Sequence, residues 1–195
     1  MRQLLIATRN KGKIKEIKYI LKDIPFAIKT LDDIDFADEV EETGKSFKEN
    51  AILKAKTVGD KIHLLTLAED SGLEIDILGG KPGIYSARFV KGSDVDRIHA
   101  LLKELTGIPK EKRTAQFKAV IALYNPMSKK PYTFEGISEG YITEKTRGEN
   151  GFGYDPIFFN LDLGKTNGEA TEEEKNKVSH RARALARCKA VLEDL

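Results

Sequence analysis

The order in which apolar patterns change along the chain limits the fold more than any other feature. Residues 3–7, in which Gln3 is followed by four apolar residues, are typical of a short buried parallel strand. The apolar residues of 14–21 then recur at helical spacing, and residues 26–30 again favour a strand. A strand, a helix and a second strand in this order predict a β-α-β unit in an α/β protein.

Helix starts and further strands follow the same logic. Ser46 with Glu49, and Thr171 with Glu174, match the S/T-x-x-E capping box, and Ser93 is a good N-cap for a third helix. We expect strands over 63–70, 114–124 and 132–143, an acidic loop over 31–46 and a glycine-rich loop over 146–156. The chain should be helical from residue 172 to its end, with a restart near Ser179. This order predicts a mixed sheet with helices on both sides.

Bulk composition excludes several classes of protein. The chain has 195 residues, which fits one α/β domain over 1–195. With 33 basic and 31 acidic residues, its charge is too balanced for a nucleic-acid binder. No apolar stretch is long enough to span a membrane. The lone Cys188 lies in a helical pattern, so we expect it to pack, and we expect the protein to be cytoplasmic.

The loop between the first strand and the first helix is suited to an anion. A helix N-terminus presents unpaired N–H groups and the positive end of the helix dipole. A glycine there permits close approach of a ligand, and a lysine can reach a phosphate. A plain βα turn with solvated lysines is an equally good interpretation of this stretch alone. The residues concerned are Thr8, Arg9, Asn10, Lys11, Gly12 and Lys13.

Two carboxylates stand at what we predict to be the carboxyl end of a buried strand. Glu69 and Asp70 are adjacent, so their side chains should point to opposite faces and have different roles. The acidic loop offers Glu41 and Glu42 as further oxygen ligands. Clustered carboxylates without His or Cys suit Mg²⁺ rather than Zn²⁺. The alternative is an aspartate that caps a bend at Ser71.

Two later stretches could contact a nucleotide base. In the glycine-rich loop, Phe152 could stack on a base and Asp155 could bond its edge, although a tight turn with buried aromatics explains the loop equally well. Near the C-terminus, Lys175, His180 and Arg181 gather around a helix start. The sequence holds no nucleophile elbow and no Cys–His pair, so metal-assisted attack by water is favoured over covalent catalysis.

Taken together, these stretches resemble the inosine triphosphate pyrophosphatase family, over nearly the whole chain. The stretches that carry the resemblance are ATRNKGK, EETGKSFKENAILKA, AEDSGLEIDILGGKPGIYSARF, GFGYDPIFF and SHRARAL. Two positions depart from the usual pattern: Arg9 stands where many members carry Gly, and Glu69 where many bacterial members carry Asp. The resemblance implies an elongated α/β fold, with a central mixed sheet flanked by helices and two lobes that enclose a nucleotide cleft. It also implies a homodimer.

The implied reaction is Mg²⁺-dependent hydrolysis of ITP, dITP or XTP to the monophosphate and pyrophosphate. Glu42 and Asp70 would bind Mg²⁺, and Asp70 would activate the attacking water with help from Glu69. Lys54 would hold the triphosphate with the residues of the first loop, and Ser71 would bond a phosphate or sugar oxygen. Phe152 would stack on the base, in a pocket shaped by Gly153, Tyr154 and Asp155. Donors to the 6-oxo group would come from Lys175, His180 and Arg181.

Two other functions remain open at this stage. One is a pyrophosphatase of modified pyrimidine nucleotides, and the other is a non-catalytic module that only binds nucleotides. The sequence also leaves open the role of Arg88 and the degree to which GTP is excluded.

Overall fold

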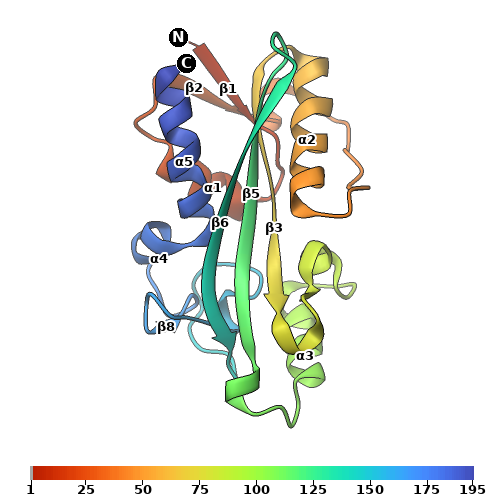
Figure 1. Cartoon of the computed structure of the whole chain (residues 1–195), viewed down its shortest axis with the longest axis vertical. Helices are drawn as coiled ribbons and strands as arrows, with labels where there is room; N and C mark the ends of the chain where they lie inside the picture. Colours follow the sequence, from red (N-terminus) through yellow and green to blue (C-terminus); the bar gives the residue numbers. More distant parts are fainter. Residues whose placement is uncertain (1) are drawn as a thin grey trace. The chain divides into compact units, whose positions relative to one another are not determined.

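The computed structural model describes residues 2–195, which form a mixed α/β structure (Figure 1). Short 3₁₀ turns connect several of its helices and strands. The strands are β1 Arg2–Ile6, β2 Phe26–Thr30, β3 Leu65–Ile75, β4 Lys81–Pro82, β5 Thr114–Asn125, β6 Lys130–Ile142, β7 Phe158–Asn160 and β8 Lys165–Thr166. The helices are α1 Lys11–Ile20, α2 Phe47–Ile62, α3 Asp94–Glu104, α4 Glu172–Val178 and α5 His180–Asp194.

The strands form one open mixed sheet in the order β2-β1-β3-β5-β6-β7-β8, with β4 paired to β3. Strand β1 is parallel to both β2 and β3, whereas the β3–β4, β6–β7 and β7–β8 pairs are antiparallel. The predicted fold class, a mixed sheet flanked by helices, is therefore confirmed. The nucleotide cleft between two lobes stays a prediction.

The chain divides into two compact units, which are described separately below. The first unit comprises residues 1–70, 119–136 and 181–195, and the second comprises residues 71–118 and 137–180. Strands β3, β5 and β6 contribute residues to both units. The single domain over residues 1–195 stays a prediction.

The first unit packs helices on both faces of its strands. Leu4 and Ile6 of β1 belong to a core with Ile17 of α1 and Leu185 and Cys188 of α5. Figure 1 shows α2 on the opposite side of the strands from α1 and α5. Burial raises the pKa of Cys188 to about 12, so this thiol packs as a small apolar side chain, as predicted.

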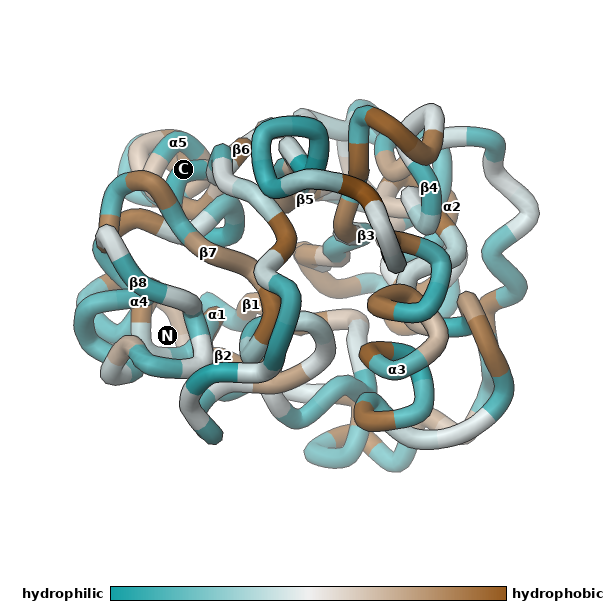
Figure 2. The backbone as a smooth tube through the Cα atoms, turned by 90° about the horizontal axis from the view of Figure 1, so that it is seen from below, coloured by the Kyte–Doolittle hydropathy of each residue, from teal (hydrophilic) through white to brown (hydrophobic). Residues whose placement is uncertain are grey.

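The second unit has a core of its own, built around α3 and the loop before β7. Leu101 and Leu105 pack with Leu73 of β3, Ile142 of β6 and Phe158 of β7. In Figure 2 the α3 tube alternates between hydrophobic and hydrophilic residues, as expected for a helix with one buried face. Ser93 and Asp96 form a reciprocal capping box at its start.

Most predicted element boundaries agree with the structure, but one error concerns the site. We predicted that the third strand ends at Glu69 and Asp70, whereas β3 continues to Ile75. The buried residues Leu73 and Ile75 continue the alternating pattern, which excludes a bend at residues 71 and 72. The two carboxylates therefore lie in the middle of a strand.

The two predicted capping boxes differ from each other. The Thr171–Glu174 box at the start of α4 is reciprocal, as predicted. At α2, Ser46 accepts from the Glu49 N–H, but the Glu49 carboxylate accepts from the N–H of Lys45 instead. In residues 2–195, no helix combines the length and the apolar character needed to cross a lipid bilayer.

Candidate functional site

The loop before α1 is held in place by its own side chains. Asn10 is the N-cap of α1, where its Oδ1 accepts from the N–H of Lys13 at 3.0 Å. The N–H of Asn10 donates to Thr8 Oγ1 at 3.3 Å. Arg9 donates to the Phe36 carbonyl, which ties the acidic loop to this segment. The N-terminus of α1 is therefore fixed in a geometry that suits an anion.

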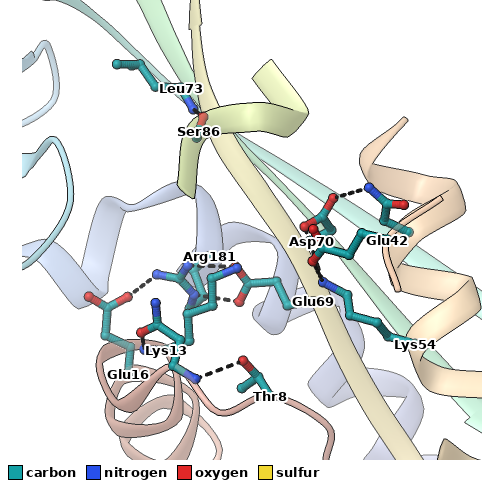
Figure 3. A network of polar contacts seen from close by, with 12 residues as sticks. Thr8, Lys13, Glu16, Glu42, Lys54, Glu69, Asp70, Leu73, Ser86 and Arg181 are labelled. Carbon is teal, nitrogen blue, oxygen red and sulfur yellow. Dashed lines mark hydrogen bonds and ion pairs between the residues drawn. The ribbon is translucent and has the colours of Figure 1, made fainter. Parts of the chain in front are cut away.

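Glu69 lies on one face of β3 within a buried ionic cluster (Figure 3). Arg181 of α5 donates to it in a bidentate pair, with Nε–Oε2 and Nη2–Oε1 distances of 2.6 Å, and also donates to Glu16 of α1. Lys13 Nζ lies 3.5 Å from Glu69 Oε1. Burial alone would lower the pKa of Arg181, but Glu69 and Glu16 outweigh it and raise that pKa. Arg181 is thus a fixed cation among carboxylates.

Asp70 lies on the other face of β3, as the alternation of strand side chains predicted (Figure 3). Its Oδ2 accepts from Asn50 Nδ2 at 3.0 Å. Lys54 Nζ lies 3.2 Å from Asp70 Oδ1 and 2.9 Å from Glu42 Oε1, so one ammonium joins the two carboxylates. Burial raises the pKa of Asp70 above its ordinary value, against the opposing charges of Lys54 and Lys13. A raised pKa makes this carboxylate a stronger base than an exposed aspartate.

The oxygen atoms of Glu42 and Asp70 suit a magnesium ion. Within residues 2–195, no group of three His, Cys, Asp or Glu side chains is arranged to hold a metal by itself. Mg²⁺ usually takes only one or two carboxylates and completes its shell with water and substrate phosphates. Two carboxylates joined by Lys54, with no nitrogen or sulfur ligand, fit that pattern.

In the second unit, Asp155 organises the glycine-rich loop. Its Oδ2 accepts from Lys175 Nζ at 2.5 Å and from the N–H of Phe152 at 2.9 Å, and its Oδ1 accepts from Asn167 Nδ2 at 3.0 Å. A Cβ added at Gly151, where φ is +78°, would lie 2.1 Å from Asp155 Oδ2, so only glycine fits there. Asp155 is thus a buried anchor of the loop. A contact between it and a base edge stays a prediction.

The aromatic side chains of this loop are held in different ways. Lys175 Nζ lies 4.8 Å from the centre of the Phe152 ring. Tyr154 is buried and its hydroxyl donates to the Ser86 carbonyl at 3.0 Å, and burial raises its pKa. The His180 ring stacks on Phe117, with centroids 4.8 Å apart and an interplanar angle of 12°. Phe152 and Lys175 are therefore the pair best suited to a planar base.

The predicted site residues divide between the two units. The first unit holds Thr8, Arg9, Asn10, Lys11, Gly12, Lys13, Glu42, Lys54, Asp70 and Arg181. The second holds Ser71, Phe152, Gly153, Tyr154, Asp155, Lys175 and His180. We expected Arg181 to act with Lys175 and His180 on the base. Arg181 donates to Glu69 and Glu16, in the first unit, and its contact with a base stays a prediction.

Sequence reasoning missed four polar residues at or near the site. Asn50 could have been found, because it lies one helical turn before Lys54 and both bond Asp70. Glu16 and Asn167 carry no local pattern that marks their partners. Asn176 of α4 is 7% exposed, and its amide has no hydrogen-bond partner within residues 2–195. Such a group costs free energy unless a ligand or water pairs with it.

The chain is similar to known proteins over nearly its whole length. The model of the family described as "Ham1 family" matches residues 4–191. A protein of Bacillus subtilis (strain 168) named dITP/XTP pyrophosphatase is 49% identical over 195 residues, which cover 99% of this chain and 98% of that protein. A protein of Geobacter sulfurreducens with the same name is 50% identical over 188 residues, which cover 95% and 94%.

Solved structures give the same answer for the fold. A HAM1 protein from Coxiella burnetii superposes with a TM-score of 0.90 at 37% identity, over 100% of both chains. The Staphylococcus aureus Ham1 protein superposes with a TM-score of 0.87 at 39% identity, over 99% of both. These matches confirm the resemblance found in the sequence motifs. The chain belongs to the Ham1 family.

Proposed function

We propose that this protein hydrolyses the non-standard purine nucleotides ITP, dITP and XTP to the monophosphate and pyrophosphate, with Mg²⁺ as cofactor. The observation that carries the proposal is the pairing of Asp70 and Glu42 through Lys54, in a chain about half identical to proteins named dITP/XTP pyrophosphatase. Carboxylates fixed beside a lysine suit a site that binds a metal ion together with phosphates.

On the phosphate side, each residue has a role that its contacts support. The N–H groups at the start of α1, which Asn10 caps, would receive phosphate oxygens. Lys13 and Lys54 would neutralise the charge of the triphosphate. Asp70 would accept a proton from the water that attacks the α-phosphorus, and pyrophosphate would leave. Mg²⁺, when bound at Glu42 and Asp70, would supply the positive charge that stabilises the transition state.

On the base side, Phe152 would stack on the purine, and Lys175 would donate to its 6-oxo group. Adenine presents an amino group at that position, so a donor there would be left without an acceptor. Sites of this kind can reject the wrong ligand by a factor of about 10⁴. Asn176, next to Lys175 in α4, is a further amide that could contact the base.

The products of ITP hydrolysis provide the most direct test. We expect the protein with ITP and Mg²⁺ to yield IMP and pyrophosphate, detected by anion-exchange chromatography and a pyrophosphate assay. Formation of IDP and phosphate would contradict attack at the α-phosphorus. Tight ITP binding without any product would support a non-catalytic module.

Removal of the metal tests the proposed cofactor. An excess of EDTA should abolish turnover, and added Mg²⁺ should restore it.

A substrate panel tests the choice of base. We expect ITP, dITP and XTP to be hydrolysed far faster than ATP, dTTP and dUTP. Preference for dTTP or dUTP would instead indicate a pyrophosphatase of pyrimidine nucleotides. The homodimer and the cytoplasmic location remain part of the proposal, and sedimentation velocity at micromolar concentration would test the dimer.

A further inference from the structure

Beside Lys175 lies a chain of buried side-chain hydrogen bonds that belongs to none of the motifs. Asn160 Nδ2 donates to Ser138 Oγ at 3.1 Å and to Asn167 Oδ1 at 3.0 Å, and Asn167 Nδ2 donates to Asp155 Oδ1 at 3.0 Å. Lys175 approaches the other oxygen of Asp155. All five side chains belong to residues that are at most 4% exposed. We call Ser138, Asn160 and Asn167 the buried amide chain.

The direction of these hydrogen bonds is set at one end by the backbone. The N–H of Asp162 donates to Asn160 Oδ1 at 3.0 Å, and a backbone N–H can only donate. Asn160 must therefore turn its amide nitrogen toward Asn167. Asn167 in turn must present its oxygen to Asn160 and its nitrogen to Asp155. The buried amide chain thus presents the amide N–H of Asn167 to the Asp155 carboxylate. The opposite orientation would place the amide oxygen of Asn167 against that carboxylate.

The Asp155 carboxylate in turn controls two groups of the proposed base pocket. Its Oδ2 accepts from both the Lys175 ammonium and the Phe152 N–H. Asn167 holds the other oxygen, so it fixes the rotation of the carboxylate plane about the Cβ–Cγ bond. A rotated carboxylate would move the acceptor that places the ammonium 4.8 Å from the Phe152 ring.

We propose that Asn167 is a positioning residue for purine recognition, which acts on the base through Asp155 and Lys175. This inference rests on the proposed function. The buried amide chain places the 6-oxo donor and the stacking ring together. The residues that contact the phosphates, in the first unit, are not part of it. Loss of Asn167 should therefore weaken recognition of the base and leave the chemical step unchanged.

The first test is Asn167→Leu, which keeps the approximate size of the side chain and removes the donor. We expect KM for ITP to rise about tenfold, because one donor to a buried carboxylate is lost. The kcat for ITP should stay within about twofold, because binding changes while the chemical step does not. The ratio of kcat/KM for ITP to that for ATP should fall. The matched control is Gln116→Leu, which removes an amide donor to Glu74 in the same unit, at 2.7 Å, and should leave all three quantities unchanged.

A double-mutant cycle shows whether the effect passes through Lys175. In a Lys175→Gln background, Asn167→Leu should raise KM by much less than it does alone, because the group it positions is gone. Additive effects would overturn the inference. So would an equal fall in kcat and kcat/KM for Asn167→Leu, because that would place its action on the chemical step.

A second variant covers the case in which Asn167→Leu does not fold. Asn160→Asp keeps the shape of the side chain and still accepts from the Asp162 N–H, but it reverses the polarity. Asn167 would then turn its nitrogen toward residue 160 and its oxygen toward Asp155. We expect KM for ITP to rise with kcat unchanged, and an unchanged KM would overturn the inference. Failure of the wild-type chain to hydrolyse ITP would overturn the proposed function and this inference with it, whereas an active wild type with unaltered variants would overturn the inference alone.

Discussion

The two units solve the problem of buried polar groups in different ways. Around β3, the first unit places carboxylates against cations: Glu69 and Glu16 against Arg181, and Asp70 and Glu42 against Lys54. In the second unit, Asp155 is paired with Lys175, and the neutral amides of Asn167 and Asn160 support this pair.

The difference matches what each ligand group needs. A triphosphate is recognised mainly by its charge, and charged side chains attract it through a field that does not depend on one fixed contact geometry. A purine ring is recognised by the position of a donor or acceptor, and neutral hydrogen bonds with a fixed polarity define such positions well. We therefore expect substitutions in the first unit to affect turnover and stability, and those in the second to affect the choice of base.

Asp70→Asn should have the largest effect. It removes the proposed base and one metal ligand while it keeps the shape of the side chain. We expect kcat for ITP to fall by about 10³-fold or more. Asp60→Asn is the control, because Asp60 accepts a hydrogen bond from Tyr124 in the same unit and has no proposed role. If Asp70→Asn kept most of the wild-type rate with native circular dichroism, Asp70 would have no part in the mechanism.

Arg181→Met tests the structural side of the ionic cluster. It leaves the buried carboxylates of Glu69 and Glu16 without their main cation, which should reduce the free energy of unfolding by about 3–5 kcal/mol in urea titrations. Lys177→Met removes a solvent-exposed cation near Glu173 and should change it by less than about 1 kcal/mol. Equal losses would mean that the cluster contributes nothing beyond a surface pair.

A pair of lysine substitutions separates the two ways of recognition. Lys175→Gln should raise KM for ITP about tenfold and lower the preference for ITP over ATP, because it replaces the proposed 6-oxo donor. Lys13→Gln should raise KM for ITP and KM for ATP by similar factors, because Lys13 is proposed to contact the phosphates that both nucleotides share. Steady-state kinetics with ITP and with ATP measures KM and the preference for ITP in each variant. Loss of base preference in the Lys13 variant would remove the proposed distinction between the units.

The sequence predicts the local features of this fold well. Three features that depend only on neighbouring residues were predicted correctly. They are the helix starts at Ser93 and Thr171, the parallel strand β1, and the opposite orientation of Glu69 and Asp70. The length of β3 was missed because Ser71 and the glycine after it also match a bend, and only pairing partners decide between the two.

The supporting contacts of the site could not be predicted in the same way. Arg181 and Glu69 are 112 positions apart, and Arg181 and Glu16 are 165 apart. No periodicity links such residues, because tertiary packing brings them together. The amide chain is equally hidden, since Asn160 and Asn167 resemble ordinary turn residues until their burial is known.

The smallest expected effect concerns the helix that carries Lys175. Hydrogen bonds from Lys165 and from the Thr171 N–H lower the pKa of Glu174 to about 2, from an ordinary value of 4.5. A lowered pKa means that the carboxylate stabilises the fold above about pH 4.5, and that this stabilisation is lost as the pH falls toward 2. Glu174→Gln should therefore be slightly less stable than wild type at pH 6, and the difference should shrink at pH 3. Urea unfolding at both pH values measures it, with Glu172→Gln as a control on the same turn of α4. A stability difference that stays constant with pH would show that the Thr171–Glu174 capping box stabilises α4 through its hydrogen bonds alone. The charge of Glu174 would then contribute nothing, in contrast to the charges of the ionic cluster in the first unit.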